Sequence, residues 1–210
     1  MNENFKGFKP AFDNGHGGLI NGIYQTDGKQ FHHPNEQPFY EGVYNRQMVK
    51  LVEQRLRERN IPFHTLVPED KDVSLQGRCE RFDRIWEKDQ LTYLTSFHGN
   101  ASPVSGTGRG IEGWTTKGRT LADPLCDFIL KRIESGFKDV TPMRFDFTDG
   151  DRDKEKDFTI LAKTKGPAMI LELGFYDNMK DYNFMKNNVI MRNLAIIIAD
   201  AMADIYLKGI

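Results

Sequence analysis

Residues 168–173 form an apolar run near the end of the chain that a single acidic side chain, Glu172, interrupts. A short and nearly continuous apolar run is typical of a strand at the centre of a sheet that is covered on both faces. Such a strand requires other elements of the same chain, most simply helices, on either side of the sheet. The run therefore favours a layered α/β architecture.

The rest of the chain fits this architecture, because short apolar runs alternate with longer amphipathic ones. We expect strands at residues 9–13, 61–67, 91–97, 110–115 and 168–173, and helices at 41–59, 121–133 and 193–207, with a further helix capped by Asp72 or Ser74. Residues 19–40 are expected to be irregular, and residues 148–157 to form a charged, solvated loop. The prediction is one domain, residues 1–210, with a mostly parallel twisted central sheet and helices on both faces.

Composition excludes several classes of function. The formal net charge of -1 gives no electrostatic reason to expect nucleic acid as a partner. No run of about 18 apolar residues occurs, so no membrane insertion is expected. The polar N-terminus lacks the apolar segment of a secretory signal, which leaves the export route open. The 2 cysteines, Cys79 and Cys126, fall in separate predicted helices without a CxxC pattern, and we expect both to be core residues.

Three side chains that can bind metal stand where a predicted strand ends or a helix begins. His16 follows the first strand in a glycine-rich turn, Glu41 opens the first long helix, and His98 follows the strand at 91–97. Binding sites in open α/β sheets gather at the carboxyl ends of the strands, so these residues are expected to meet. Two imidazoles and one carboxylate form a known catalytic zinc set that leaves a fourth position for water.

Glu172 is a fourth candidate. A carboxylate in a central strand costs several kcal/mol unless it is paired, hydrogen-bonded or near a cation. Since Glu172 lies near the carboxyl end of its strand, it is placed to act as the general base for a water activated by the metal. Ser96 and Asn100 flank His98 and are candidates for hydrogen bonds around the ligands.

Each candidate also has a purely structural interpretation. His16 could be a turn histidine, His98 a core histidine, and Glu41 an acid that offsets the helix macrodipole. The glycines around His16 are also similar to the oxyanion loop of some esterases, but the chain contains no Gly-x-Ser-x-Gly motif.

Other clusters are weaker candidates. His32 and His33 are adjacent, so their side chains point apart on an extended segment, and we expect a loop role for both. His64 alternates within a predicted strand and is expected to be half exposed. Residues 106–110 lack the GxGxxG spacing and are expected to form a mobile loop. Cys79 lies on an apolar helix face, where cysteines are usually inert.

The order of these motifs resembles that of the zinc-dependent N-acetylmuramoyl-L-alanine amidases of the Amidase 3 type. The shared motifs are Asp13-Asn14-Gly15-His16-Gly17-Gly18, Glu41 with Asn45 one turn on, Ser96-Phe97-His98-Gly99-Asn100-Ala101, and Glu172-Leu173-Gly174-Phe175 followed by Asn178 and Asp181. The resemblance extends from about residue 8 to residue 207. It implies one zinc ion held by His16, Glu41 and His98, with Glu172 as the catalytic carboxylate.

The chain also departs from the family pattern. Arg78 is present after the Ser74-Leu75 helix start, but Asp83-Arg84 occupies the place of an Ala-Asn pair. Gly113-Trp114 follows Glu112 where the family has a Val-Tyr type of pair, and Lys163 stands where many relatives carry arginine. Residues 24–37 are expected to be an insertion specific to this protein. These differences bear on substrate detail more than on the chemistry.

The resemblance implies a peptidoglycan hydrolase that cuts the amide bond between N-acetylmuramic acid and L-alanine of the stem peptide. It implies action on the cell wall or in the periplasm, and we expect a monomer. Lys163 and Arg109 are candidates for holding anionic groups of the substrate. Two alternatives stay open: a zinc metallopeptidase acting on stem-peptide bonds, and a non-catalytic cell-wall-binding module. The intact set of motif residues disfavours the second. The sequence does not choose between a phage lysis enzyme and a wall-remodelling enzyme.

Overall fold

A six-stranded sheet forms the centre of the protein in the computed structural model, which describes residues 4–210. The strands lie in the order β6 (His64–Thr65), β1 (Lys9–Asn14), β7 (Thr92–Asn100), β10 (Ala168–Phe175), β8 (Glu112–Thr115) and β9 (Lys154–Glu155). The first four run parallel, β8 pairs antiparallel with β10, and β9 runs parallel to β8. The predicted mostly parallel α/β sheet is confirmed.

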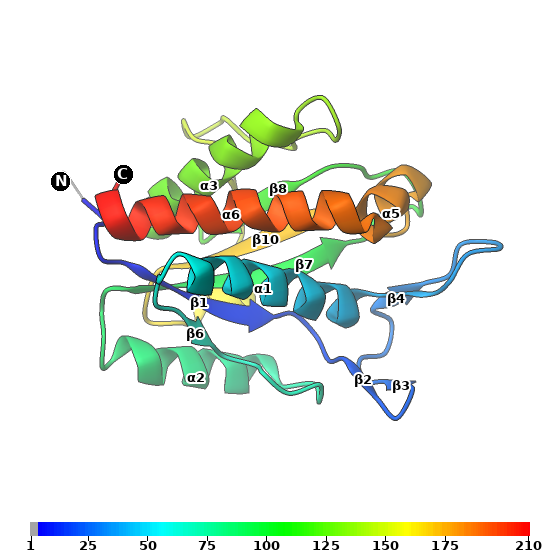
Figure 1. The fold of residues 1–210 in the computed structure, drawn as a ribbon, viewed down its shortest axis with the longest axis horizontal. Coiled ribbons are helices and arrows are strands. Elements are labelled where there is room, and N and C mark those ends of the chain that lie inside the picture. Colours follow the sequence, from blue (N-terminus) through cyan, green and yellow to red (C-terminus); the bar gives the residue numbers. More distant parts are fainter. Residues whose placement is uncertain (1–3) are drawn as a thin grey trace.

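Helices cover both faces of this sheet (Figure 1). One face carries α1 (Glu41–Glu58), α3 (Ala122–Phe137) and α6 (Asn188–Lys208), which pack over side chains such as Phe12 and Leu171. The opposite face carries α2 (Leu75–Trp86) and the short α4 (Thr159–Ala162), over side chains such as Leu94 and Ile170. Leu171 and Ile170 are neighbours in β10 and are buried on opposite faces, which explains why this strand is apolar at successive positions.

The helix ends follow from capping side chains. Of the two predicted caps for α2, Ser74 is the N-cap, since its Oγ accepts the backbone N–H of Gly77 at 3.1 Å. The closing helix begins at Asn188 instead of residue 193, because Asn187 caps it by accepting from the backbone of Val189 and Ile190. A further helix that the sequence did not predict, α5 (Met179–Lys186), connects β10 to α6.

Two strands differ in length from the prediction. β7 continues past residue 97 to Asn100, because β10 extends beside it until Phe175 pairs with Asn100. His98 and Asn100 therefore lie inside the strand and not after it. At the sheet edge, only His64–Thr65 of the predicted strand 61–67 pairs with β1. His64 is half-buried there, as expected.

The segment from residue 19 to residue 40 is more regular than predicted. It contains two small hairpins, β2 (Leu19–Ile20) with β3 (Ile23–Tyr24), and β4 (Gln30–Phe31) with β5 (Phe39–Tyr40). Both hairpins lie beyond the carboxyl ends of β1 and β7 (Figure 1). The segment therefore borders the edge of the sheet at which a binding site is expected.

The charged segment 148–157 is only partly solvated, which corrects the prediction. Asp153 is buried, because Thr115 of β8 donates a hydrogen bond to it at 2.5 Å. The next two residues form β9. Cys79 and Cys126 are both buried, and within residues 4–210 neither forms a disulfide, in agreement with a core role. No helix in the described part of the chain combines the length and the apolar character needed to cross a membrane.

Candidate metal centre

His16, Glu41 and His98 meet at the carboxyl end of the sheet. The Oε1 of Glu41 lies 3.1 Å from Nε2 of His16 and 2.9 Å from Nδ1 of His98. One potential ligand atom from each of the three residues falls within 4.8 Å of the other two. The sequence therefore selected three residues that the fold brings into one cluster.

The donor atoms of this cluster suit a divalent cation. Within residues 4–210, the buried Oε2 of Glu41 has no hydrogen-bond partner and lies 3.9 Å from Nζ of Lys29, while the buried Nε2 of His16 faces Oε1 of Glu41 at 3.1 Å. A buried polar atom without a partner is costly, and a bound cation would satisfy both of these atoms. Two imidazole nitrogens and a carboxylate oxygen are also the donor types that zinc prefers.

Small residues allow the three ligands to approach one another. A side chain at Gly15 would collide with the His98 ring, and one at Gly42 would collide with the Gly17 carbonyl. His16 itself adopts a φ of 65°, in the left-handed region that a residue with a side chain rarely occupies. The turn after β1 is therefore held in a conformation that its neighbours must stabilise.

Helix α1 stabilises this turn from one side. Nδ2 of Asn45 donates to the Gly15 carbonyl at 3.0 Å, and Nη1 of Arg46 donates to the His16 carbonyl at 2.9 Å. Both residues are buried. Because Glu41 opens the same helix, the contacts that fix the turn also fix the distance between Glu41 and His16.

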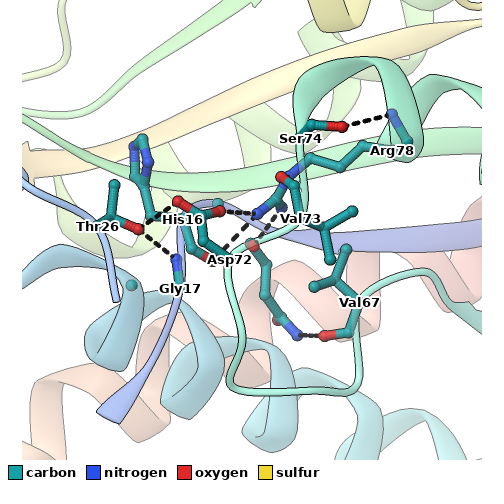
Figure 2. Close-up of polar contacts among 12 residues, drawn as sticks. His16, Gly17, Thr26, Val67, Asp72, Val73, Ser74 and Arg78 are labelled. Carbon is teal, nitrogen blue, oxygen red and sulfur yellow. Dashed lines mark hydrogen bonds and ion pairs between the residues drawn. The ribbon is translucent and has the colours of Figure 1, made fainter. Parts of the chain in front are cut away.

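Arg78 of α2 stabilises the turn from the other side (Figure 2). Its guanidinium pairs with Asp13 and with Asp72, the latter at 3.0 Å, and donates to the His16 carbonyl at 3.1 Å. Thr26, between β3 and β4, then links Asp72 to the backbone N–H of Gly17, at 2.5 and 2.8 Å (Figure 2). The cavity beside these groups has a volume of about 280 Å³ and is lined by His16, His98 and the start of α2.

A chain of polar contacts orients His98. Nε2 of His98 lies 3.1 Å from Oγ of Ser96, and Ser96 donates to Oδ2 of Asp13 at 2.5 Å. Because the Ser96 proton goes to the aspartate, the serine oxygen is free to accept from Nε2–H of His98. Without a cation, Nδ1 of His98 shares a hydrogen bond with Oε1 of Glu41 at 2.9 Å. With a cation between them, this arrangement leaves Nδ1 unprotonated and available to it.

The electrostatics of the cluster favour a charged Glu41. Burial acts to raise the pKa of Glu41, but hydrogen bonds with His16 and His98 hold it at about 2. Burial lowers the pKa of His16. Burial also acts to lower the pKa of His98, but the hydrogen bond and the charge of Glu41 outweigh it and raise the value. A carboxylate that stays ionised is a better cation ligand.

Glu172 faces the same side of the sheet as His98. The two residues are register partners in the parallel pair β10–β7, and Glu112 is the partner of Glu172 in β8. The Oε2 of Glu172 is buried and has no hydrogen-bond partner in the described residues. Burial raises the pKa of Glu172 to about 7, the nearby His98 lowers it, and the charges of Glu41 and Glu112 raise it. A carboxyl group of this kind can accept and return a proton near neutral pH.

The other predicted site residues lie apart from this cluster. Nδ2 of Asn100 donates to Glu112 at 2.7 Å, Arg109 pairs with Asp181 at 3.3 Å, and Lys163 is exposed at the end of α4. Within residues 4–210, none of the three forms a hydrogen bond or ion pair with the metal-ligand candidates or with Glu172. His33, for which a loop role was expected, is buried, because its Nε2 lies 2.9 Å from the Tyr176 carbonyl.

Glu112 is buried beside Glu172 and was not among the predicted site residues. Its carboxylate receives hydrogen bonds from Asn100, Trp114, Arg144 and Lys154. The signal in the sequence is the one that identified Glu172, an acidic residue inside a predicted strand. Its partners Arg144 and Lys154 lie more than thirty residues further along the chain, so no local pattern indicates them.

Comparison with known families settles the class of this site. The family model described as N-acetylmuramoyl-L-alanine amidase, Amidase_3, matches residues 11–204. The chain belongs to this family. It is accordingly an amidase, a peptidoglycan hydrolase that cleaves the bond between N-acetylmuramic acid and L-alanine, in agreement with the class expected from the motifs. No curated protein sequence matches the amidase.

Solved structures show the same fold. An N-acetylmuramoyl-L-alanine amidase from Clostridium difficile 630 superposes with a TM-score of 0.72 at 22% identity, over 95% of this chain and 97% of the other. The amidase AmiC2 of Nostoc punctiforme gives a TM-score of 0.68 at 20% identity, over 94% and 96% of the two chains. The catalytic domain of the CD27L endolysin, which targets Clostridium difficile, gives 0.66 at 20% identity, over 97% and 99%.

Proposed function

We propose that this amidase is zinc-dependent, and that His16, Glu41 and His98 hold one zinc ion while Glu172 transfers the proton. The observation that carries the proposal is the approach of three ligand atoms to within 4.8 Å of one another, with the unpaired carboxyl of Glu172 in the adjoining register position. Bound zinc supplies Lewis acidity, which makes water a nucleophile near neutral pH and polarises an amide carbonyl.

Glu172 performs the proton transfers in this proposal. As the water attacks the amide carbonyl, the Glu172 carboxylate accepts its proton, and the resulting carboxyl group returns that proton to the leaving amine of L-alanine. Both steps need a group whose pKa lies near the working pH. Burial raises the pKa of Glu172 to about 7 and so meets this requirement.

Ser96, Asp13 and Arg78 act on the site through His98 and the turn. The chain from His98 through Ser96 to Asp13 fixes the tautomer of His98, and Arg78 holds Asp13 and the His16 carbonyl in place. These residues position the ligands and do not contact the reacting amide.

The first test separates binding of the metal from turnover. We expect Glu172→Gln to reduce amidase activity by several orders of magnitude and to retain zinc, because the side chain keeps its size and is not a proposed ligand. Metal analysis of the purified variant and a peptidoglycan-release assay measure the two quantities. Glu87→Gln, at an exposed glutamate paired with Lys165, is the matched control and should behave as wild type. Substantial residual activity in Glu172→Gln would remove Glu172 from the proton-transfer step.

Action on the cell wall follows from this substrate, and the monomeric state stays a prediction. The two alternatives make different products: a metallopeptidase acting on stem-peptide bonds would release fragments cut within the peptide, and a binding module would release nothing. The unpaired Glu172 beside a complete ligand set favours the amidase over the binding module, because binding alone has no use for such a group.

A further inference from the structure

A cationic cluster lies next to Glu172 on the same face of the sheet. Glu112 pairs with Glu172 across β8 and β10, so their Cβ atoms are about 5 Å apart. Lys154 of β9 pairs with Trp114, two residues beyond Glu112, and so faces the same side. Arg144 reaches this row from the segment that follows α3.

Glu112 holds both cations through a single carboxylate oxygen. Nε of Arg144 and Nζ of Lys154 each donate to Oε2 of Glu112 at 2.7 Å, while Asn100 and Trp114 donate to Oε1 at 2.7 and 3.1 Å. The carboxylate of Glu112 is outnumbered by the two cations that it holds, Arg144 and Lys154. A further carboxylate, Asp146, acts on Lys154, since hydrogen bonds from Thr148 and the charge of Lys154 lower the pKa of Asp146. Arg144 is therefore the cation of this cluster that is better placed to bind a ligand.

The guanidinium of Arg144 is fixed in place but still has donors to offer. Its Cζ lies 5.0 Å from the centre of the Phe175 ring, and Nε is bound to Glu112. Within residues 4–210, neither Nη nitrogen donates to a protein acceptor, and the side chain is 39% exposed. A planar, immobilised guanidinium whose two Nη groups are both free is suited to bind a carboxylate in a bidentate manner.

Arg144 lies within reach of a peptide whose amide reacts at Glu172, because it binds the register partner of Glu172. An extended peptide advances about 3.3 Å per residue. If the amide reacts at Glu172, a carboxylate one or two residues further along the peptide can therefore reach Arg144, which lies beside the neighbouring strand β8. The apolar walls formed by Phe175 and Trp114 would strengthen such an ion pair by limiting water.

We propose that Arg144 is a specificity-determining residue, which binds a carboxylate of the stem peptide on the leaving-amine side, and that Glu112 and Lys154 are its positioning residues. This inference rests on the proposed function, because it assumes that the reaction takes place at Glu172. It predicts a preference for stem peptides with a free carboxylate close to L-alanine over those in which this group is a carboxamide.

The experiment compares two synthetic muramyl peptides that differ only in a carboxylate or carboxamide on the residue after L-alanine. Binding is measured by calorimetric titration of the Glu172→Gln protein with zinc present, so the result does not depend on turnover. We expect the carboxylate peptide to bind about tenfold more tightly, and Arg144→Gln added to this background to abolish the difference. The affinity for the carboxamide peptide should stay within about twofold of its value in the Glu172→Gln protein that keeps Arg144.

Arg132→Gln is the matched control, since Arg132 is also a half-exposed arginine that pairs with one carboxylate, Asp204, and stacks on a ring, Phe128. It should leave the preference unchanged. If Arg144 had a merely structural role, Arg144→Gln would weaken the binding of both peptides equally, and that result would overturn the proposal. Equal binding of the two peptides by the Glu172→Gln protein would also overturn it. Turnover by the wild-type enzyme is assayed separately, and its absence would count against the proposed function and not against the binding preference.

Discussion

At the scale of single residues, His98 depends on a partner that is not itself one of the proposed metal ligands. Ser96 accepts a hydrogen bond from the ring and donates its own to Asp13, which leaves Nδ1 of His98 to face Glu41 and the proposed metal. Loss of such a partner typically weakens metal affinity by about 10-fold to 100-fold. We therefore expect Ser96→Ala to weaken zinc binding by an amount in this range, measured by competition with a chelator of known affinity.

Thr95→Val is the control for this prediction. Thr95 is also buried in β7, but it pairs with Phe12 and Met169 and faces the opposite side of the sheet. Its substitution should leave the zinc affinity unchanged. Equal affinity in Ser96→Ala and wild type would mean that the tautomer of His98 is set without Ser96.

The metal-ligand cluster was accessible to sequence reasoning because its members sit at predictable places. His16 follows a strand, Glu41 begins a helix, and the fold brings such positions to one edge of the sheet. Arg144 was not accessible, because its contact with Glu112 joins two segments 32 residues apart that have no common periodicity. Buried polar networks of this kind depend on tertiary geometry, which a linear pattern does not encode.

At the scale of elements, α1 must approach the turn after β1 very closely. The first turn of the helix passes so near the Gly17 carbonyl that any side chain at Gly42 would overlap it. We expect Gly42→Ala to push α1 away, to lower the free energy of unfolding by about 1–3 kcal/mol, and to weaken zinc binding because Glu41 moves with the helix. Urea unfolding and metal titration measure the two effects.

Gly77→Ala in α2 is the comparison for Gly42→Ala. Its new Cβ would meet only the side chains of Val73 and Ser74, at 3.2 and 3.3 Å. This variant should keep its zinc affinity and change little in stability. If Gly42→Ala bound zinc as tightly as Gly77→Ala, the close contact between α1 and the turn would not determine the position of Glu41.

The packing of β8 against the segment before β9 predicts a pH effect on stability. Burial, together with the neighbouring Asp151, raises the pKa of Asp153 from 3.8 to about 8, against a lowering by the hydrogen bond from Thr115. Between these pH values the folded protein retains a proton that the unfolded chain has lost, so this contribution to stability falls as the pH rises toward about 8. We expect Asp153→Asn to be more stable than wild type at about pH 8, with a difference that shrinks toward about pH 5.

Urea unfolding of both proteins across this pH range tests the prediction, with Asp139→Asn as the control at an exposed aspartate. The control should follow the wild-type pH dependence. A constant difference between Asp153→Asn and wild type at all pH values would contradict the raised pKa.

Much of the element pattern was predictable, and the exceptions share a cause. The central strand, the starts of α1 and α2 and the two-faced sheet followed from periodicity and capping. The errors lie where tertiary pairing decides: β7 continues because β10 runs beside it, and Asp153 is buried because Thr115 binds it. Hairpins β2–β3 and β4–β5 are too short to give a strand pattern.

At the scale of the whole molecule, the proposed metal should couple to folding. The three ligands come from β7, the turn after β1, and α1, so an ion bound between them ties these segments together only in the folded state. A ligand that binds only the folded state stabilises it by about 2.7 kcal/mol at one hundred times its Kd. We expect removal of zinc by a chelator to lower the melting temperature, and added zinc to restore it.

The triple variant in which His16, Glu41 and His98 are all replaced by Gln serves as the control for this melting experiment. Its melting temperature should not respond to zinc. A response of the same size in the triple variant would place the stabilising ion elsewhere.

In the proposed mechanism, zinc held by His16, Glu41 and His98 lets this amidase cleave the bond between N-acetylmuramic acid and L-alanine. Mass spectrometry of purified peptidoglycan, after incubation with the protein with and without a zinc chelator, tests it most directly. The predicted products are free stem peptides that begin with L-alanine, formed without the chelator and lost with it. Fragments cut within the peptide, or no release even with added zinc, would contradict the claim.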